Sequence, residues 1–216
     1  RQNDKVNHTF NFQFSNTTDV PRYDRLTETS GGLPRFAQWY YGPEKRLLAG
    51  YQLQLDKGVS WFTNARLTLA YQNIEESRNS RRFNNPGLRR QVEKVQVWSA
   101  NLDVAKNLST NNTLRYGAEI TYNNVNSSAT SLDITTNLVT PWNTRYPDGG
   151  STYLTSGLYL TNQHRMADGK LIASAGLRYS LVQLKAKFES KEFFPFPYSE
   201  ANQTNNALNG NLGLVW

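Results

Sequence analysis

The chain has 216 residues, a formal net charge of +7 and no cysteine, so it has no disulfide framework, thiolate metal site or cysteine nucleophile. No stretch approaches the roughly 18 consecutive apolar residues that a membrane-spanning helix requires. Aromatic residues make up 12% of the chain and charged residues only 19%, a balance that argues against a disordered chain.

Polar and apolar residues alternate along most of the chain. The period is two, which is typical of β-strands with one apolar and one polar face. It predicts about eight strands, whose apolar faces lie within residues 8–14, 47–55, 61–71, 98–104, 114–122, 154–160, 171–181 and 208–216. The phase is mixed over residues 92–97, which predicts a bulge or an irregular strand entry there.

Short and long connections alternate between these strands. Tight polar turns are expected at residues 56–58, 107–112 and 167–169. Long connections are expected at residues 17–45, 78–90, 124–151 and 188–206. Transmembrane β-barrels sort their loops in this way, with short turns on the periplasmic side and long loops outside the cell, whereas a soluble sandwich or lipocalin normally does not. The predicted fold class is therefore all-β, a transmembrane antiparallel up-and-down β-barrel.

The aromatic residues and the two faces support the same prediction. Trp61 and Tyr71 are about ten residues apart on one predicted strand, or roughly 24 Å along the membrane normal, close to the height of the apolar band between two aromatic girdles. The side chains expected to face lipid include Leu67, Leu69, Ala118, Ile120, Ala175 and Leu177. Those expected to face the lumen include Arg66, Glu119 and Arg178.

Several segments resemble a known family. Residues 146–151 (Tyr-Pro-Asp-Gly-Gly-Ser) precede Gly-Leu-Tyr-Leu at 157–160 and Ala-Gly-Leu-Arg-Tyr-Ser at 175–180. Together with residues 19–26, 39–43 and 209–215, this run resembles the middle barrel region of TonB-dependent outer-membrane receptors, particularly the type common in Bacteroidetes.

This resemblance implies a transporter in the outer membrane of a Gram-negative bacterium. Its barrel would have 22 strands around an N-terminal plug domain, and a segment of the plug would couple to TonB. The nutrient would be a ferric siderophore, haem, a vitamin or a glycan. The chain contains no plug, no TonB box and no terminal strands, and eight strands use its whole length. We therefore expect residues 1–216 to be one partial barrel domain, an excerpt of a larger receptor, in contact with outer-membrane lipid and lipopolysaccharide.

Basic residues gather in the predicted extracellular loops. The first loop carries Arg22, Arg25, Arg35, Lys45 and Arg46, and the second carries Arg78, Arg81, Arg82, Arg89, Arg90 and Lys94. These groups either face solvent and lipopolysaccharide or bind an anionic ligand, because arginine binds phosphate and carboxylate groups through two parallel hydrogen bonds.

Aromatic residues beside arginine in the first loop have the composition of a binding hot spot. The candidate ligand-binding residues are Arg35, Phe36, Trp39, Tyr40, Tyr41, Arg78, Arg81 and Arg82. Alternatively, Trp39, Tyr40 and Tyr41 pack the loop onto itself or anchor it at the membrane interface.

Other chemistry has little support in the sequence. The two histidines, His8 and His164, stand far apart, and no cluster has the spacing of metal ligands, a catalytic site or a phosphate loop. We therefore expect no enzyme, no cofactor and no metal site. Nucleic-acid binding is not expected, because the aromatic residues lie on the predicted lipid face.

Two other functions remain open. The chain could be a complete eight-stranded outer-membrane barrel with a structural or adhesive role, and its terminal Trp216 fits that alternative. It could also be a soluble β-barrel that binds a small ligand.

Overall fold

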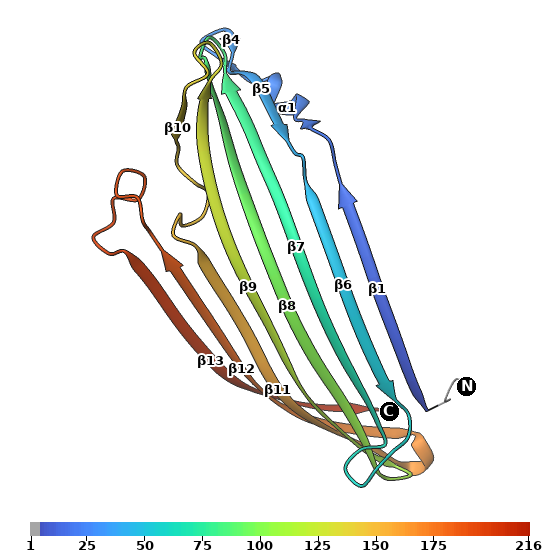
Figure 1. Ribbon diagram of the computed structural model, residues 1–216. Coiled ribbons are helices and arrows are strands. Elements are labelled where there is room, and N and C mark those ends of the chain that lie inside the picture. The colour runs from blue at the N-terminus through green and yellow to red at the C-terminus, as the bar shows by residue number, and fades with distance from the viewer. Residues whose placement is uncertain (1–4) are drawn as a thin grey trace.

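The computed structural model describes residues 5–216, and nearly all of its regular structure is antiparallel β-sheet (Figure 1). The long strands are β1 (Val6–Asn16), β6 (Lys45–Leu55), β7 (Asn64–Arg82), β8 (Gly87–Ser109), β9 (Asn112–Asp133), β11 (Ser151–Met166), β12 (Leu171–Lys187) and β13 (Glu200–Val215). The short elements are β2 (Val20–Pro21), α1 (Tyr23–Leu26), β3 (Thr29–Ser30), β4 (Leu33–Pro34), β5 (Phe36–Tyr41), β10 (Val139–Pro141) and a 3₁₀ turn, Ala167–Gly169. Among residues 5–216, no helix is both long and apolar enough to cross a membrane.

The eight long strands follow one another in space as they do along the chain. The order across the sheet is β1-β6-β7-β8-β9-β11-β12-β13, and each neighbouring pair is antiparallel. Within the described residues, β1 and β13 do not pair with each other, so each leaves one edge open. The β6–β7, β8–β9 and β11–β12 connections lie at one end of the sheet, which we call the turn end (Figure 1). The other end, which we call the loop end, carries three long connections and the short β7–β8 turn at residues 83–86.

The cross-strand register confirms the predicted separation of faces. Arg66 pairs with Asp103, which pairs with Gly117, and this row continues through Tyr159 to Arg178. The next row is apolar and contains Leu67, Leu102, Ala118, Leu158 and Tyr179. Side chains of one row share a face and those of the next row share the other, because successive residues of a strand point to opposite sides. We call the two faces the inner (polar) and outer (apolar) faces.

Charged and polar side chains pair with one another on the inner face. Arg178 forms an ion pair with Glu119, and the Tyr159 hydroxyl donates a hydrogen bond to Asp103. Gly117 lies beneath this contact, and a Cβ atom there would overlap with the Tyr159 ring and hydroxyl. Glycine at this position therefore lets the large Tyr159 side chain lie flat against the sheet.

Aromatic side chains mark two levels of the outer face. Toward the loop end, Tyr71, Trp98 and Tyr122 pair across β7, β8 and β9, with ring centroids 5.3 Å and 6.0 Å apart. At the turn end, Trp61 and Phe62 contact each other edge-on. The prediction that Trp61 belongs to the same strand as Tyr71 is wrong, because β7 begins at Asn64 and Trp61 lies in the β6–β7 connection.

Several further expectations differ from the structure. The tight turn expected at residues 56–58 is a connection over residues 56–63, and the long connection expected at 124–151 is shorter because β9 continues to Asp133. The sequence pattern predicts a long loop at residues 78–90, but β7 and β8 continue as a hairpin in which only residues 83–86 lie between the strands. The expected irregularity at 92–97 is absent, since β8 pairs there without interruption, and its register shift lies between Asn107 and Ser109. Cross-strand pairing on both sides of β8 overrides the mixed local pattern.

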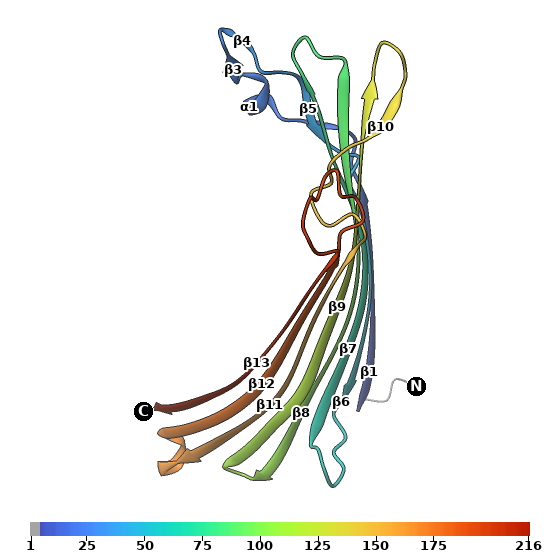
Figure 2. The same cartoon turned by 90° about the vertical axis from the view of Figure 1, so that its left-hand side faces the viewer.

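The sheet is strongly curved. Figure 2 shows the turn ends of β8 to β13 bending toward one side, and α1, β3 and β4 projecting toward that same side at the loop end. Arg22, which directly precedes α1, contacts the rings of Trp39 and Tyr41, and these residues have the inner-face register, so this connection lies over the inner face.

Candidate ligand-binding surface

The loop end of the inner face carries the predicted site, and β5 positions its first part. Above the end of β6, β5 takes its place beside β7, with Tyr41 opposite Arg78 and Trp39 opposite Ser80. Gly42 directly follows β5 in the short connection to β6. It has a φ of 100° and no room for a Cβ atom, because that atom would lie 2.6 Å from the Thr18 carbonyl oxygen. Only glycine fits this junction readily.

Buried polar groups hold the junction in place. The Ser77 hydroxyl and the Asn79 amide both donate to the Gly42 carbonyl oxygen, at 2.5 Å and 3.1 Å, and both side chains are buried. Satisfied buried hydrogen bonds of this kind fix a backbone position, because an unpaired buried group would be costly.

Two aromatic rings and two guanidinium groups form a cluster on the inner face. The rings of Trp39 and Tyr41 meet edge-on, with centroids 4.9 Å apart. The Arg22 guanidinium carbon lies 5.2 Å and 5.4 Å from the two ring centroids, and that of Arg78 lies 5.5 Å from both. Trp39 is only 8% exposed. We call Arg22, Trp39, Tyr41 and Arg78 the arginine–aromatic cluster, and cation–π attraction stabilises it.

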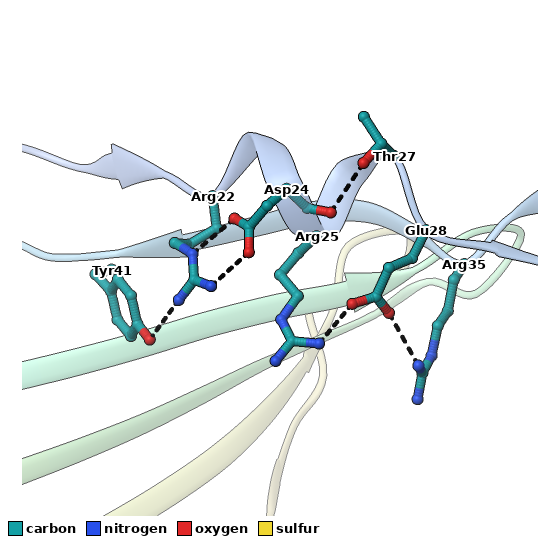
Figure 3. Close-up of polar contacts among 7 residues, drawn as sticks. All are labelled: Arg22, Asp24, Arg25, Thr27, Glu28, Arg35 and Tyr41. Carbon is teal, nitrogen blue, oxygen red and sulfur yellow. Dashed lines mark hydrogen bonds and ion pairs between the residues drawn. The ribbon is translucent and has the colours of Figure 1, made fainter.

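The ion pair between Arg22 and Asp24 attaches α1 to this cluster, and Glu28 forms a separate network with Arg25 and Arg35 (Figure 3). Arg22 donates to both carboxylate oxygens of Asp24, at 2.7 Å and 2.5 Å, and to the Tyr41 hydroxyl at 2.9 Å. Glu28 accepts from Arg25 at 2.5 Å and from Arg35 at 2.9 Å. The hydrogen bonds from Arg22 hold the pKa of Asp24 at about 2, below its ordinary 3.8, and those from Arg25 lower the pKa of Glu28 in the same way.

The α1 connection should consequently loosen in acid. The pKa of Asp24 is lower in the folded loop than in an unfolded chain, so the carboxylate stabilises the loop above pH 3.8 and loses this effect as the pH falls toward about 2. Hydrogen exchange of residues 23–28, corrected for its intrinsic pH dependence, should be constant from pH 7 to 5 and should accelerate below about pH 4. Asp24→Asn should show the faster exchange already at neutral pH. Exchange that stays constant down to pH 2 would contradict this prediction.

A second polar group lies nearby on the inner face. Glu76 and Glu93 are directly opposite each other on β7 and β8, and Arg145 contacts them at 3.4 Å and 3.3 Å. Glu93 is 4% exposed and also accepts from the Ser127 hydroxyl. Burial raises the pKa of Glu93, while Arg145 opposes that shift. Arg145 thus holds residues 142–146 against the hairpin by neutralising two like charges.

The neighbouring Trp142 extends this contact. The Arg89 guanidinium carbon lies 4.1 Å from the Trp142 ring centroid, and the Gln91 amide donates to the Asn143 carbonyl oxygen at 2.9 Å. The inner face at the loop end is therefore rich in arginine side chains supported by aromatic rings.

The structure separates the predicted site residues by face. Phe36, Trp39, Tyr41, Arg78 and Arg82 share the inner-face register, and Arg35 lies over the Phe36 ring at 5.2 Å. Tyr40 and Arg81 point to the outer face. All of them except Arg35 lie on strands β5 and β7 rather than in loops.

Trp142 and Arg145 are not among the residues that the sequence pattern singles out. A tryptophan and an arginine within a polar, proline-containing connection are a weak local signal. The partners of Arg145 on β7 and β8 are 69 and 52 residues away, so only the folded sheet brings them together. Within residues 5–216, no group of three histidine, aspartate or glutamate side chains could hold a metal ion.

Comparisons with known proteins agree with this architecture. The family model described as "TonB dependent receptor-like, beta-barrel" matches residues 1–216. Among solved structures, "Copper transporter OprC" is similar with a TM-score of 0.66 and 12% identity, over 84% of this chain and 29% of that chain. At this identity the likeness shows the fold alone, and this chain spans about 29% of the length of that protein. The comparison with curated proteins gives no match.

These findings confirm the predicted fold, family and location in the outer membrane. The family consists of transporters rather than enzymes, as the sequence predicts. The Bacteroidetes type stays a prediction. Because the family model covers the whole sequence, the chain belongs to the TonB-dependent receptor family and forms part of its outer-membrane β-barrel.

Proposed function

We propose that this chain is part of a receptor that takes up a scarce nutrient across the outer membrane. The observation that carries the proposal is the sheet's two-sided chemistry, with an apolar outer face and an inner face of paired charges that leads to the arginine–aromatic cluster. A wide barrel needs such an inner face, because its lumen is wet or filled by a plug.

The complete receptor would contain more than these eight strands. We propose that residues 1–216 are one partial barrel domain of a 22-stranded barrel, with the plug domain and the TonB-coupling segment supplied by other parts of the receptor. The open edges of β1 and β13 support this proposal. Outer-membrane lipid and lipopolysaccharide would contact the outer face.

The nutrient would be a ferric siderophore, haem, a vitamin or a glycan, and its contacts would come from the loop end of the inner face. The shared inner-face register of Phe36, Trp39, Tyr41, Arg78 and Arg82 supports that role. Arg35 lies at the edge of this surface, whereas Tyr40 and Arg81 serve as outward-facing comparisons. Copper appears only in the name of the structural neighbour, and we do not propose it as the substrate of this receptor.

Uptake by cells tests this proposal. Cells with the complete receptor should accumulate one labelled nutrient of these four classes, and removal of the receptor or of TonB should abolish that accumulation. Trp39→Ala with Tyr41→Ala should weaken binding of that nutrient by at least about 1–2 kcal/mol, because rigid aromatic anchors dominate such interfaces.

Tyr40→Ala is the matched control, since Tyr40 lies between the two on the same strand but faces outward. Its affinity should stay close to that of the wild type. If none of the four classes depended on the receptor, the transport proposal would fail. If the double variant reached the cell surface and bound normally, the cluster would have a structural role only.

A further inference from the structure

Three arginines at the loop end of the inner face lack the partners that their neighbours have. The nearby carboxylates are engaged: Asp24 with Arg22, Glu28 with Arg25 and Arg35, and Glu76 and Glu93 with Arg145. Within the part of the chain that the structure describes, Arg78, Arg82 and Arg89 form no ion pair and donate no side-chain hydrogen bond. The Arg78 Nε atom is buried without a partner. We call these three the inner-face arginines.

The strand register makes Arg89 a diagonal neighbour of both Arg78 and Arg82. Arg78 and Arg82 are four residues apart on β7, and Arg89 lies opposite Ser80, midway between them on β8. Diagonal cross-strand neighbours are within reach of long side chains. Consistent with this placement, burial and the charge of Arg82 lower the pKa of Arg89. Like charges so close together repel each other unless an anion lies between them.

Aromatic rings hold two of these guanidinium groups in place. Arg89 lies over Trp142 at 4.1 Å, and Arg78 lies over Trp39 and Tyr41 at 5.5 Å. A guanidinium group contacts an aromatic ring through its face, so its N–H groups remain free to donate within its own plane. Such orientation reduces the conformational entropy lost on binding and favours ligands that accept two parallel hydrogen bonds.

We propose that Arg78, Arg82 and Arg89 bind a multiply charged anionic part of the nutrient, either a phosphate or a group of carboxylates. This inference rests on the proposed function and narrows its substrate class. Lipopolysaccharide phosphate has the same chemistry but lies against the outer face. On that face, Arg81 and Arg90 occupy the adjacent positions of the same two strands. The chain therefore supplies comparable arginine pairs on opposite faces, although Arg81 also donates to the Gln38 amide oxygen and the Asn85 carbonyl oxygen.

The experiment compares these pairs in the purified complete receptor, with inorganic tripolyphosphate as the probe. The wild type should bind tripolyphosphate measurably by calorimetry, and more weakly as salt is raised, because the contact is electrostatic. Arg82→Gln with Arg89→Gln should weaken binding about tenfold or more, since each replacement removes hydrogen bonds to a charged group. Arg81→Gln with Arg90→Gln should change the affinity less than about twofold.

The heat-dependent electrophoretic mobility of the barrel reports whether each variant is folded. If the inner-face glutamine variant does not fold, Arg82→Lys with Arg89→Lys replaces it, because lysine keeps the charge but loses the two-pronged geometry. A loss of several-fold in the lysine variant would support the site.

Two results would overturn the inference: no binding of tripolyphosphate by the wild type, or equal losses in the inner and outer pairs. The latter would assign the binding to general surface charge or to a lipid-facing site. Both results concern binding to the purified receptor without TonB, so they leave the uptake test untouched. If uptake failed but only the inner-face variant lost tripolyphosphate binding, the transport proposal would be rejected and the anion-binding site would still be supported.

Discussion

Replacing Leu67 by arginine is expected to destabilise the folded barrel by about 2–4 kcal/mol, the cost of a cationic side chain at the lipid-facing midplane of an outer-membrane barrel. Leu67 lies in the apolar outer-face row, between the aromatic level of Tyr71 and that of Phe62. Its cross-strand partners, Leu53 and Leu102, offer the new charge no polar contact. Reversible urea unfolding of the complete receptor in lipid vesicles would measure the change in unfolding free energy.

The adjacent Thr68 provides the control. Thr68 faces the inner surface, where Gln52 and Asn101 are its cross-strand partners. Thr68→Arg should therefore cost much less than Leu67→Arg, because its guanidinium group remains in a polar environment. Equal costs for the two substitutions would show that the outer face does not contact lipid.

The second large effect concerns the open edges of the sheet. Expressed alone, the 216-residue chain should not form a stable monomer in membranes, since unpaired backbone groups in lipid cost several kcal/mol each. Within residues 5–216, β1 and β13 each pair on one side only, which leaves two long strand edges open. In detergent, light scattering should show oligomers or aggregates, and electrophoresis of unheated samples should show no heat-resistant monomer.

Addition of the remaining strands, by expression of the complete receptor, is the matched comparison and should restore a heat-resistant barrel. In the 216-residue chain expressed alone, Phe12→Cys on β1 and Leu212→Cys on β13 would test whether the two edge strands pair with each other. A disulfide between the two cysteines would show that the strands had closed into a barrel. A monodisperse, heat-resistant monomer with these strands joined would support the alternative of a complete eight-stranded barrel with a structural or adhesive role.

Local sequence was sufficient for the strands and their faces. Successive residues of a strand point to opposite faces, so the alternation of polar and apolar residues by itself places Leu67 and Arg66, or Ala118 and Glu119, on opposite faces. The long connections expected near residues 17–45, 124–151 and 188–206 likewise indicated a barrel, whereas the one expected at 78–90 is a four-residue turn.

Only the tertiary structure decided how the site is assembled. The extension of β7 to Arg82, the insertion of β5 above β6, and the contact of Arg145 with Glu76 and Glu93 all depend on pairing between distant segments. The same pairing divided the adjacent residues Tyr40 and Tyr41, or Arg81 and Arg82, between the two faces. Residue types alone were enough to predict these side chains as candidate ligand contacts. Which of them face the lumen follows from the register, because shifting a strand by one residue exchanges its two faces.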